Sequence, residues 1–393
     1  MARHRKTWSL VAVTVCLSIV LTSCWDKLEM DELALVSLIG IDFDPEKEIT
    51  TVYYQVINPL SSATTQGTSG PDEAPVFTYQ AIGKSFGEAR MNIYKSLSRQ
   101  LFVAHHQAVI VSKRAAKAGL RDLVNFVEML PNSRTSTPLL VADAPLVQVM
   151  YSFTPLERLP SDAVDARLDL LRKNTLFMGK QIELKHFIER MERKTMTVHP
   201  MISQTGTASG NISDTSSNID ARQTNIFFNQ GAVFRDYRMV GSLTAQQMVW
   251  YYLLEGEKGR HTFRMPIGGK PVTILFKSVR IKKKVERSPE KPVVKIFLDL
   301  ELNSVFSEEH VPQTLVQARR FEDAVDRGIR KELHSFYERT KKRNWDLLRI
   351  GDLLLKHGLA TPENIDTAAK EAKVEFYVHA KLGQTGGMKQ IYQ

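Results

Sequence analysis

The sequence predicts an α+β fold, a mixed α/β architecture built from several domains. Strand-like segments, in which apolar residues alternate or run together, are interspersed with segments whose apolar residues recur at helical spacing. The central part contains antiparallel hairpin patterns, and the C-terminal part contains one long helical pattern. At 393 residues the chain is long enough for two or three domains.

The first 23 residues have the pattern of a secretory signal peptide. A basic start precedes an apolar run from Leu10 to Leu21, which is shorter than the roughly 20 residues that a bilayer span needs. The run ends in Leu-Thr-Ser-Cys, which resembles a bacterial lipobox: an aliphatic residue and two small residues precede a cysteine that receives the lipid. We therefore predict a cleaved leader at residues 1–23 and a lipid anchor on Cys24. An ordinary signal peptide with a chance cysteine and an uncleaved anchor helix are the alternatives.

Cysteine usage supports the lipid anchor. The chain has two cysteines, and Cys16 would leave with the leader, so Cys24 would be the one thiol of the mature protein. That thiol could form no internal disulfide, and acylation explains an odd cysteine in an exported chain. We expect an ectodomain that is tethered to the outer face of the cell membrane.

The charge balance also suits a membrane-proximal position. The formal charge of +10 falls to +7 when the three basic residues of the leader are removed. A mildly basic exported domain is attracted to anionic lipid headgroups. Export, and the lack of a motif that combines aromatic stacking with basic residues, argue against nucleic acid as a partner.

Residues 24–202 are expected to form an N-terminal α/β domain. One of its helices opens with Ser85 and Glu88 in capping-box spacing. A segment rich in Ser, Thr and Gly at 61–74 is expected to be a surface loop. The predicted strands lie at 36–42, 51–58, 106–112 and 137–144, and the predicted helices at 85–97, 116–130, 161–171 and 182–193.

Residues 203–222 are predicted to be a flexible linker, because the segment has almost nothing apolar to bury. A central β-rich domain at 223–312 follows, with a hairpin, a short helix at 245–254 and two long alternating strands. A C-terminal domain at 313–393 combines a helix at 315–342, whose apolar stripe includes Val316, with a final strand.

Basic residues cluster near the tip of the two long central strands. They are Lys282, Lys283, Lys284 and Arg287. A solvated hairpin end is the plain interpretation of such a cluster, and a patch that faces lipid or cell wall is the alternative.

The sequence specifies no catalytic chemistry. His105 and His106 lie at a strand start without a third ligand at metal spacing, and the segment 265–269 lacks the lysine of a phosphate loop. A His-Glu-x-x-His motif is absent from the sequence. We therefore expect a protein that is not an enzyme and has no cofactor or metal.

Four segments, taken together and in order, resemble blocks of one protein family. They are Cys24–Asp42, Gly83–Leu120, Gly231–Thr244 and Asp346–Lys356. The family is Ger(x)C, the lipoprotein C subunits of bacterial spore germinant receptors. One position differs: after Gly-Ser-Leu-Thr the family usually has a glutamate at the helix start, where this chain has Ala-Gln-Gln.

The resemblance implies a three-domain ectodomain without known catalytic activity, anchored by lipid to the outer face of the spore's inner membrane. It also implies two integral membrane partners, a channel-like A-type subunit and a transporter-like B-type subunit that senses the nutrient. On that basis the protein would be needed for nutrient-triggered germination and would act in assembly or signal coupling.

The helix at 245–254 contains the candidate partner interface. Trp250, Tyr251 and Tyr252 are proposed for it because aromatic residues are enriched in interface cores. A helix of this kind can also pack inward, which is the alternative.

Two other classes of function are alternatives to the receptor subunit. A solute-binding lipoprotein of a membrane transporter would show two similar lobes of repeated βα units around a cleft, and the sequence shows no such repetition. A wall-active hydrolase would need paired carboxylates or a metal site.

Overall fold

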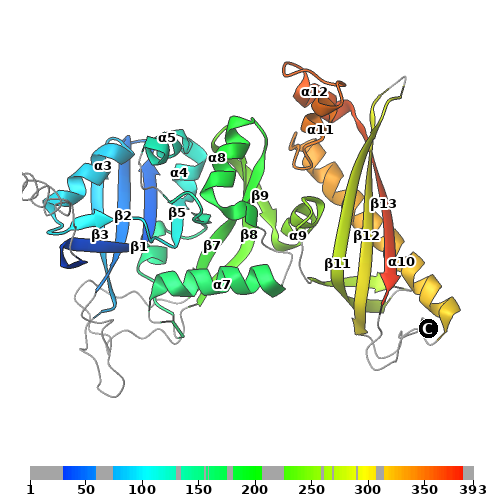
Figure 1. The fold of residues 1–393 in the computed structure, drawn as a ribbon, viewed down its shortest axis with the longest axis horizontal. Coiled ribbons are helices and arrows are strands. Elements are labelled where there is room, and N and C mark those ends of the chain that lie inside the picture. Colours follow the sequence, from blue (N-terminus) through cyan, green and yellow to red (C-terminus); the bar gives the residue numbers. More distant parts are fainter. Residues whose placement is uncertain are drawn as a thin grey trace, which may run out of the picture.

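The protein is described by a computed structural model that covers residues 30–58, 74–129, 134–154, 156–157, 159–174, 180–205, 225–257, 261–267, 270–288, 291–306 and 314–383. Figure 1 shows an elongated molecule with one sheet toward each end of its long axis. Helices cover these sheets, so the predicted α+β fold class is confirmed.

The first sheet has nine strands, in the order β3-β2-β1-β5-β6-β7-β8-β9, with β4 beside the start of β1. Strands β1, β5, β6 and β7 are parallel, and antiparallel hairpins extend the sheet on both sides. The strands are β1 (Leu33–Asp44), β2 (Ile49–Ile57), β3 (Val76–Gly83), β4 (Gln100–Phe102), β5 (Ala108–Ser112), β6 (Leu139–Ala142), β7 (Thr197–Thr205), β8 (Asn225–Arg235) and β9 (Arg238–Thr244).

Both faces of this sheet are covered, which explains why its central strands read as continuous apolar runs. All five residues of β5 are buried, and alternate residues join two different apolar clusters on the two faces. Four helices cover one face, namely α3 (Phe86–Asn92), α4 (Lys113–Ala118), α5 (Arg121–Met129) and α8 (Leu184–Glu192) (Figure 1). Two helices cover the other face, α6 (Leu146–Met150) and α7 (Pro160–Asn174). Short 3-10 turns occupy Met30–Glu32, Ile93–Lys95 and Lys180–Ile182.

One predicted helix is wrong in its extent. The helix expected at 116–130 is two helices, α4 and α5, because Gly119 follows α4 with a φ of 126°. That backbone conformation is outside the helical region and is readily adopted only by glycine. The predicted capping box at Ser85 is confirmed on one side, since its hydroxyl accepts a hydrogen bond from the Glu88 N–H.

The predicted domain boundary at 203–222 does not separate two sheets. Strand β7 before it and strand β8 after it pair with each other, from Thr197 opposite Phe234 to Thr205 opposite Asn225. Strands β8 and β9, assigned from sequence to the central domain, therefore extend the first sheet. Residues 206–224 lie outside the described part of the chain.

The second sheet has the order β10-β11-β12-β13, in which the last pair is parallel. Its strands are β10 (His261–Ile267), β11 (Lys270–Glu286), β12 (Val293–Phe306) and β13 (Lys373–Leu382). The connection from β12 to β13 contains three helices, α10 (Leu315–Lys342), α11 (Ile350–Lys356) and α12 (Ile365–Glu371). The sheet thus joins the predicted central and C-terminal domains, which the sequence had divided at 312/313. The predicted helix at 315–342 is confirmed, but Val316 is 61% exposed and does not belong to its buried stripe.

Helix α9 (Ala245–Leu254) connects the two sheets. Thr244 and Gln247 form a complete capping box at its start. Trp250, Tyr251 and Tyr252 are 2%, 1% and 0% exposed, and they belong to an apolar cluster that continues from the first sheet into the second. The prediction that these three rings form an accessible partner interface is therefore wrong, because both faces of the helix are covered.

Candidate functional site

Of the two predicted functional sites, the structure describes one. Cys24, the predicted lipidation site, lies outside the described residues. The three aromatic residues of α9 lie in the middle of the molecule, at the junction between the two sheets. That junction is the part of the described structure where charged groups are most deeply buried, and it is the candidate functional site.

Aromatic packing holds α9 against both sheets. The Trp250 ring stacks on Phe263 of β10, with ring centroids 4.4 Å apart. On the other side, the Tyr252 hydroxyl donates a hydrogen bond to the Val198 carbonyl of β7 at 3.3 Å. The helix therefore contacts both sheets, and a movement of one sheet relative to the other would disturb these contacts.

A buried ion cluster follows directly after α9. Glu255 is the C-cap residue of the helix, and its side chain is 1% exposed. Its carboxylate lies 2.5 Å from a guanidinium nitrogen of Arg190 in α8 and 3.1 Å from one of Arg349 before α11. One carboxylate therefore joins α8, α9 and α11, three elements that are far apart in the sequence.

Local backbone geometry positions the third member of this cluster. Arg349 has a φ of 54°, in the left-handed region, immediately before α11 begins. Asp346 stabilises the start of that helix, because its two carboxylate oxygens accept hydrogen bonds from the N–H groups of Ile350 and Gly351, both at 2.8 Å. The Asp346 bonds fix the first turn of α11, and that turn directs Arg349 toward Glu255.

The electrostatics of the cluster favour an ionised Glu255. Burial by itself would raise the pKa of this carboxyl, but the nearby guanidinium groups of Arg190 and Arg349 outweigh it, so the net pKa is lowered. Lys283 of β11 lies at the edge of the cluster and donates to the Leu348 carbonyl at 3.0 Å. Burial lowers the pKa of Lys283 and raises the pKa of Asp346.

The position of Lys283 also shows that the basic residues predicted at the tip of the two long strands do not form one cluster. Its side chain points inward to the junction, whereas its neighbours Lys282 and Lys284 are exposed on the opposite face of the strand. Alternation along a strand places successive side chains on opposite faces, so a run of lysines cannot form one patch.

A second contact between the sheets lies beside the ion cluster. The Trp345 ring covers Gly241 of β9 so closely that a Cβ atom at this glycine would lie 2.4 Å from the ring. Arg343 lies over the same indole, with its guanidinium carbon 4.7 Å from the ring centroid. Arg235 of β8 donates a hydrogen bond to the Asn344 carbonyl. The segment after α10 is thus held against the last hairpin of the first sheet.

A groove of ≈ 660 Å³ opens next to these contacts. Arg235, Tyr337, Lys341, Trp345 and Lys370 are among the residues that line it, together with acidic residues of α12. The groove lies between the β8–β9 hairpin of the first sheet and helices α10 and α12, which belong to the second sheet. Its shape therefore depends on how the two sheets are held together.

Charged side chains also pair at one end of β1 in the first sheet. Arg114 bonds to the carboxylates of Asp42 and Asp44, which lie at the carboxyl end of β1. Of the predicted histidine pair, His105 is exposed and His106 is buried. Across the residues that the structure describes, no group of three or more His, Cys, Asp and Glu side chains has the arrangement of a metal site.

The ion cluster was not predicted from the sequence. Arg190, Glu255 and Arg349 carry no motif and are separated by 65 and 94 residues, so only the tertiary structure brings them together. A deeply buried carboxylate that binds two arginines can hold elements in a defined arrangement, and it needs no substrate to do so.

Two protein-family models match the chain. The model described as "Spore germination protein N-terminal domain" matches residues 26–204, and the model described as "Spore germination B3/GerAC like, C-terminal" matches residues 229–386. Together they cover most of the chain, including both sheets.

Curated proteins are similar to parts of it. Spore germination protein KC of Bacillus subtilis (strain 168) is 34% identical over 164 residues, which are 41% of this chain and 40% of that protein. Putative spore germination protein YfkR of the same organism is 21% identical over 176 residues, 45% of this chain and 46% of that protein. Each match thus spans less than half of the relative's length.

A solved structure shares the fold. The crystal structure of the GerBC protein matches with a TM-score of 0.53 and 13% sequence identity, and the match covers 88% of this chain and 97% of that one. At this identity the likeness supports the fold alone. In the described part of the chain, no helix is both long enough and apolar enough to cross a bilayer.

Proposed function

Because the chain belongs to the GerAC family of spore germination proteins, we propose that it is the lipid-anchored C subunit of a nutrient germinant receptor. In this role it is not an enzyme. It acts in assembly or signal coupling with two integral membrane subunits, one of A type and one of B type, and nutrient-triggered germination requires it. Acylation of Cys24 would hold it on the outer face of the spore's inner membrane.

The observation that carries this proposal is the match of both halves of one family along the same chain, over residues 26–204 and 229–386. The junction supports a coupling role. An apolar cluster and the Glu255 ion pairs connect the two sheets, so a displacement at one end of the molecule can be transmitted to the other end.

Tethering gives a physical reason for the anchor. Confining a domain to the plane of a membrane raises its effective concentration next to other membrane proteins, so that a weak interface is sufficient for assembly.

The test is a tagged pull-down from mild-detergent extracts of spore inner membranes. We compare wild type with Cys24→Ala, and we use Cys16→Ala as the matched control, because that cysteine lies in the predicted leader and would be removed. Two polytopic subunits are expected with wild type and with Cys16→Ala, and are expected to be depleted with Cys24→Ala.

Recovery of equal amounts with Cys24→Ala would refute the role of the anchor. Recovery of components of an ATP-driven permease in place of the two subunits would refute the receptor assignment and would favour the solute-binding lipoprotein.

A further inference from the structure

The second sheet has one covered face and one open face. Helix α10 packs against the first, where Val294, Ile296 and Leu298 of β12 are fully buried. On the other face no element of the described structure lies over the strands. Beyond the bulge at Phe276 in β11, side chains on β11, β12 and β13 alternate, so every second described residue of each strand points to this open face.

Basic residues and two aromatic rings characterise the open face. Six of the outward side chains between β11 and β13 are Lys or Arg and four are Asp or Glu. Two of the acids are already paired on the face itself, Glu286 with Lys295 at 2.7 Å and Glu375 with Lys373 at 2.8 Å. We call the central part the lysine–aromatic face: Arg280, Lys282, Lys284, Lys295, Phe297 and Tyr377.

The two rings of this face pack side by side. Phe297 of β12 and Tyr377 of β13 lie opposite each other in the register, and their rings are stacked with centroids 4.9 Å apart. The ammonium group of Lys284 lies 5.4 Å from the centre of the Phe297 ring. Tyr377 is 40% exposed. Aromatic rings with a polar tip, surrounded by long basic side chains, are the composition that proteins use at the headgroup level of membranes.

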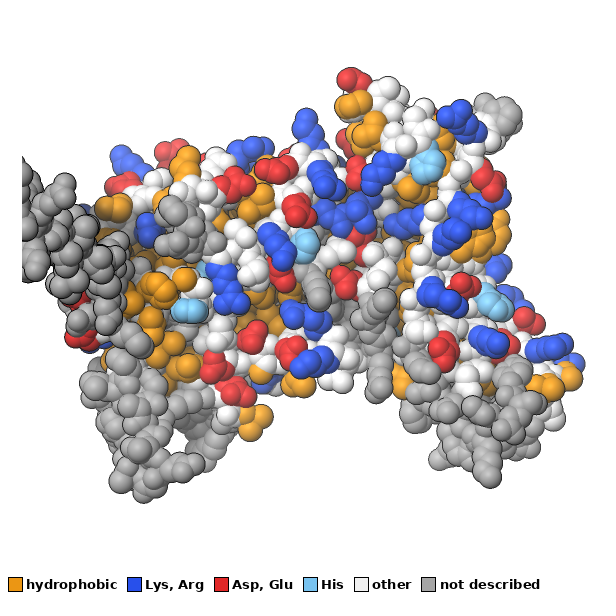
Figure 2. All heavy atoms as spheres, viewed as in Figure 1, with side chains coloured by type: hydrophobic (Ala, Val, Ile, Leu, Met, Phe, Trp, Pro, Cys, Tyr) orange, Lys and Arg blue, Asp and Glu red, His pale blue; other side chains and the backbone are white. Residues whose placement is uncertain are grey.

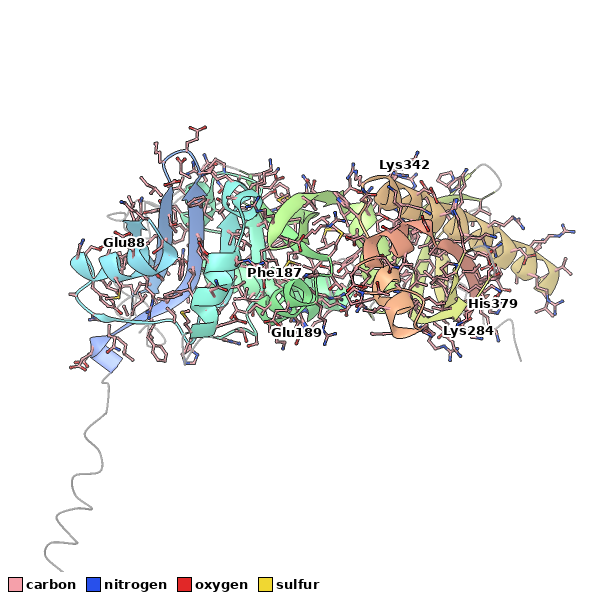
Figure 3. The ribbon with its side chains drawn as sticks, turned by 90° about the horizontal axis from the view of Figure 1, so that it is seen from above. Glu88, Phe187, Glu189, Lys284, Lys342 and His379 are labelled. Carbon is pink, nitrogen blue, oxygen red and sulfur yellow. The ribbon has the colours of Figure 1, made fainter. Side chains whose placement is uncertain are left out.

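The lysine–aromatic face lies on the same side of the molecule as the start of the described chain. In Figure 3 Lys284 and His379 are labelled on the lower side, and the first residues of β1 also lie on that side at the other end of the long axis. Helix α10 and Lys342 lie on the upper side. Figure 2 looks onto the open face, where Lys and Arg side chains gather over β11 to β13.

The length of the chain before the described residues limits how far this side can be from a membrane. Cys24 precedes Met30 by six residues. At no more than about 3.6 Å per residue, this segment reaches roughly 20 Å. An acyl group on Cys24 would therefore keep the start of β1 close to the headgroups, and the other end of the molecule would be free to approach the same surface.

We propose that the lysine–aromatic face docks on an anionic phospholipid surface, so that the molecule lies along the membrane with the acyl anchor at one end and the second sheet at the other. The inference rests on the proposed anchor at Cys24. The acyl chains hold the first end without help from charge, whereas the second end has no lipid and is held by its lysines, its arginine and the Tyr377 ring.

The outer surface of α10 is a competing surface of similar chemistry. Arg319, Arg320 and Arg327 are exposed there, and no partner is shown for them. Helix α10 lies on the upper side in Figure 3, away from the start of β1, so the tether favours the sheet over the helix. Arginines on α10 therefore provide a control with the same change of charge on the opposite side.

The test measures binding of the mature chain to vesicles. Residues 24–393 are used with Cys24→Ser, so that no acyl chain contributes. The vesicles are of phosphatidylcholine alone or of phosphatidylcholine mixed with phosphatidylglycerol. The sheet variant is Arg280→Gln/Lys282→Gln/Lys284→Gln, and the control is Arg319→Gln/Arg320→Gln/Arg327→Gln. Unfolding in urea checks that both variants fold like the parent.

We expect the parent to bind the mixed vesicles and not the neutral ones, with binding that weakens as salt is added. Each removed charge close to an anionic surface weakens binding roughly fivefold. The sheet variant is therefore expected to lose at least about tenfold in affinity, and the α10 variant to change by less than about twofold.

Equal binding to both vesicle types, no binding at all, or an equal loss with the α10 variant would each overturn the proposal. The pull-down with Cys24→Ala is independent of this result. Vesicle binding can fail while the receptor subunits are still recovered, and the subunits can be lost while vesicle binding persists.

Discussion

Replacing Glu255 by glutamine removes the negative charge on which two arginines converge. The side chain keeps its length and can still accept a hydrogen bond, so the variant tests the charge and not the packing. The Glu255 side chain is 1% exposed and the Arg190 side chain is 12% exposed, which places their 2.5 Å contact in the interior. Removing one partner of a buried ion pair leaves an uncompensated charge and typically costs about 3–5 kcal/mol.

Exposure decides which end of that range applies. Arg349 is 31% exposed, so water screens its loss of a partner and its share of the cost is small. We therefore expect Glu255→Gln to lower the free energy of unfolding by about 3 kcal/mol, most of it from the uncompensated charge on Arg190.

Urea unfolding of the mature chain measures this cost. Trp250 and Trp345 are buried at the junction, so their fluorescence reports on the region that the substitution disturbs. Glu128→Gln on the exposed surface of α5 removes the same charge without a described partner, and it should change the free energy of unfolding by less than about 0.5 kcal/mol.

The pH dependence gives a second measure of the same contribution. The pKa of Glu255 in the folded protein is lower than the usual 4.5 of a glutamate carboxyl, because Arg190 and Arg349 outweigh the effect of burial. Its stabilisation is therefore present above that value and is lost as the pH falls toward the folded pKa. Equal unfolding of Glu255→Gln and Glu128→Gln at neutral pH would refute the reasoning, because the ion pairs of Glu255 would then add nothing measurable to the free energy of unfolding.

Three further variants test other parts of the structure. Burial lowers the pKa of His199 from 6.5 to about 4, so its contribution to the free energy of unfolding is complete above pH 6.5 and should fall by about 3 kcal/mol as the pH drops to 4. Urea unfolding of His199→Phe at a series of pH values should lack this fall. The same pH dependence in the variant would contradict the role given to His199. Gly241→Ala places a methyl group 2.4 Å from the Trp345 ring, and overpacking of this kind costs about 1–3 kcal/mol. The variant should have a lower melting temperature and altered indole fluorescence. Parental values for both quantities would show that the ring moves freely. Thr244→Ala removes the N-cap of α9 and should lower the free energy of unfolding in urea by about 1 kcal/mol. Thr244→Ser keeps the hydroxyl and should be as stable as the parent. An equal loss with serine would show that the cap is not the cause.

Local patterns in the sequence were sufficient for most of the elements. The helix predicted at 315–342 and the helix predicted at 245–254 have those bounds in the structure, because helical periodicity and capping residues act within a few positions of each other. The hairpin around Asp236 is likewise confirmed, since two residues with positive φ form its turn. The exception at Gly119 is also local, because a single φ of 126° divides one predicted helix into two.

Local patterns in the sequence could not predict which strands pair with each other. The low-complexity segment at 203–222 suggested a domain boundary, yet β7 and β8 pair across it, because the hydrogen bonds of a sheet edge are satisfied by whichever strand the fold brings there. The aromatic run in α9 was compatible with an interface or with a core, and only the presence of a sheet on each side made it core.

The sequence by itself determined the class of fold, the positions of most helices and strands, the family resemblance and the prediction of an anchor at Cys24, since each depends on neighbouring residues or on short motifs. The tertiary structure alone decided that Glu255 binds Arg190 and Arg349, and that Lys282 and Lys284 share an open face from which Lys283 is excluded. The reason is physical: burial and charge pairing depend on distances in space, and residues separated by 65 or 94 positions leave no mark of those distances in the sequence.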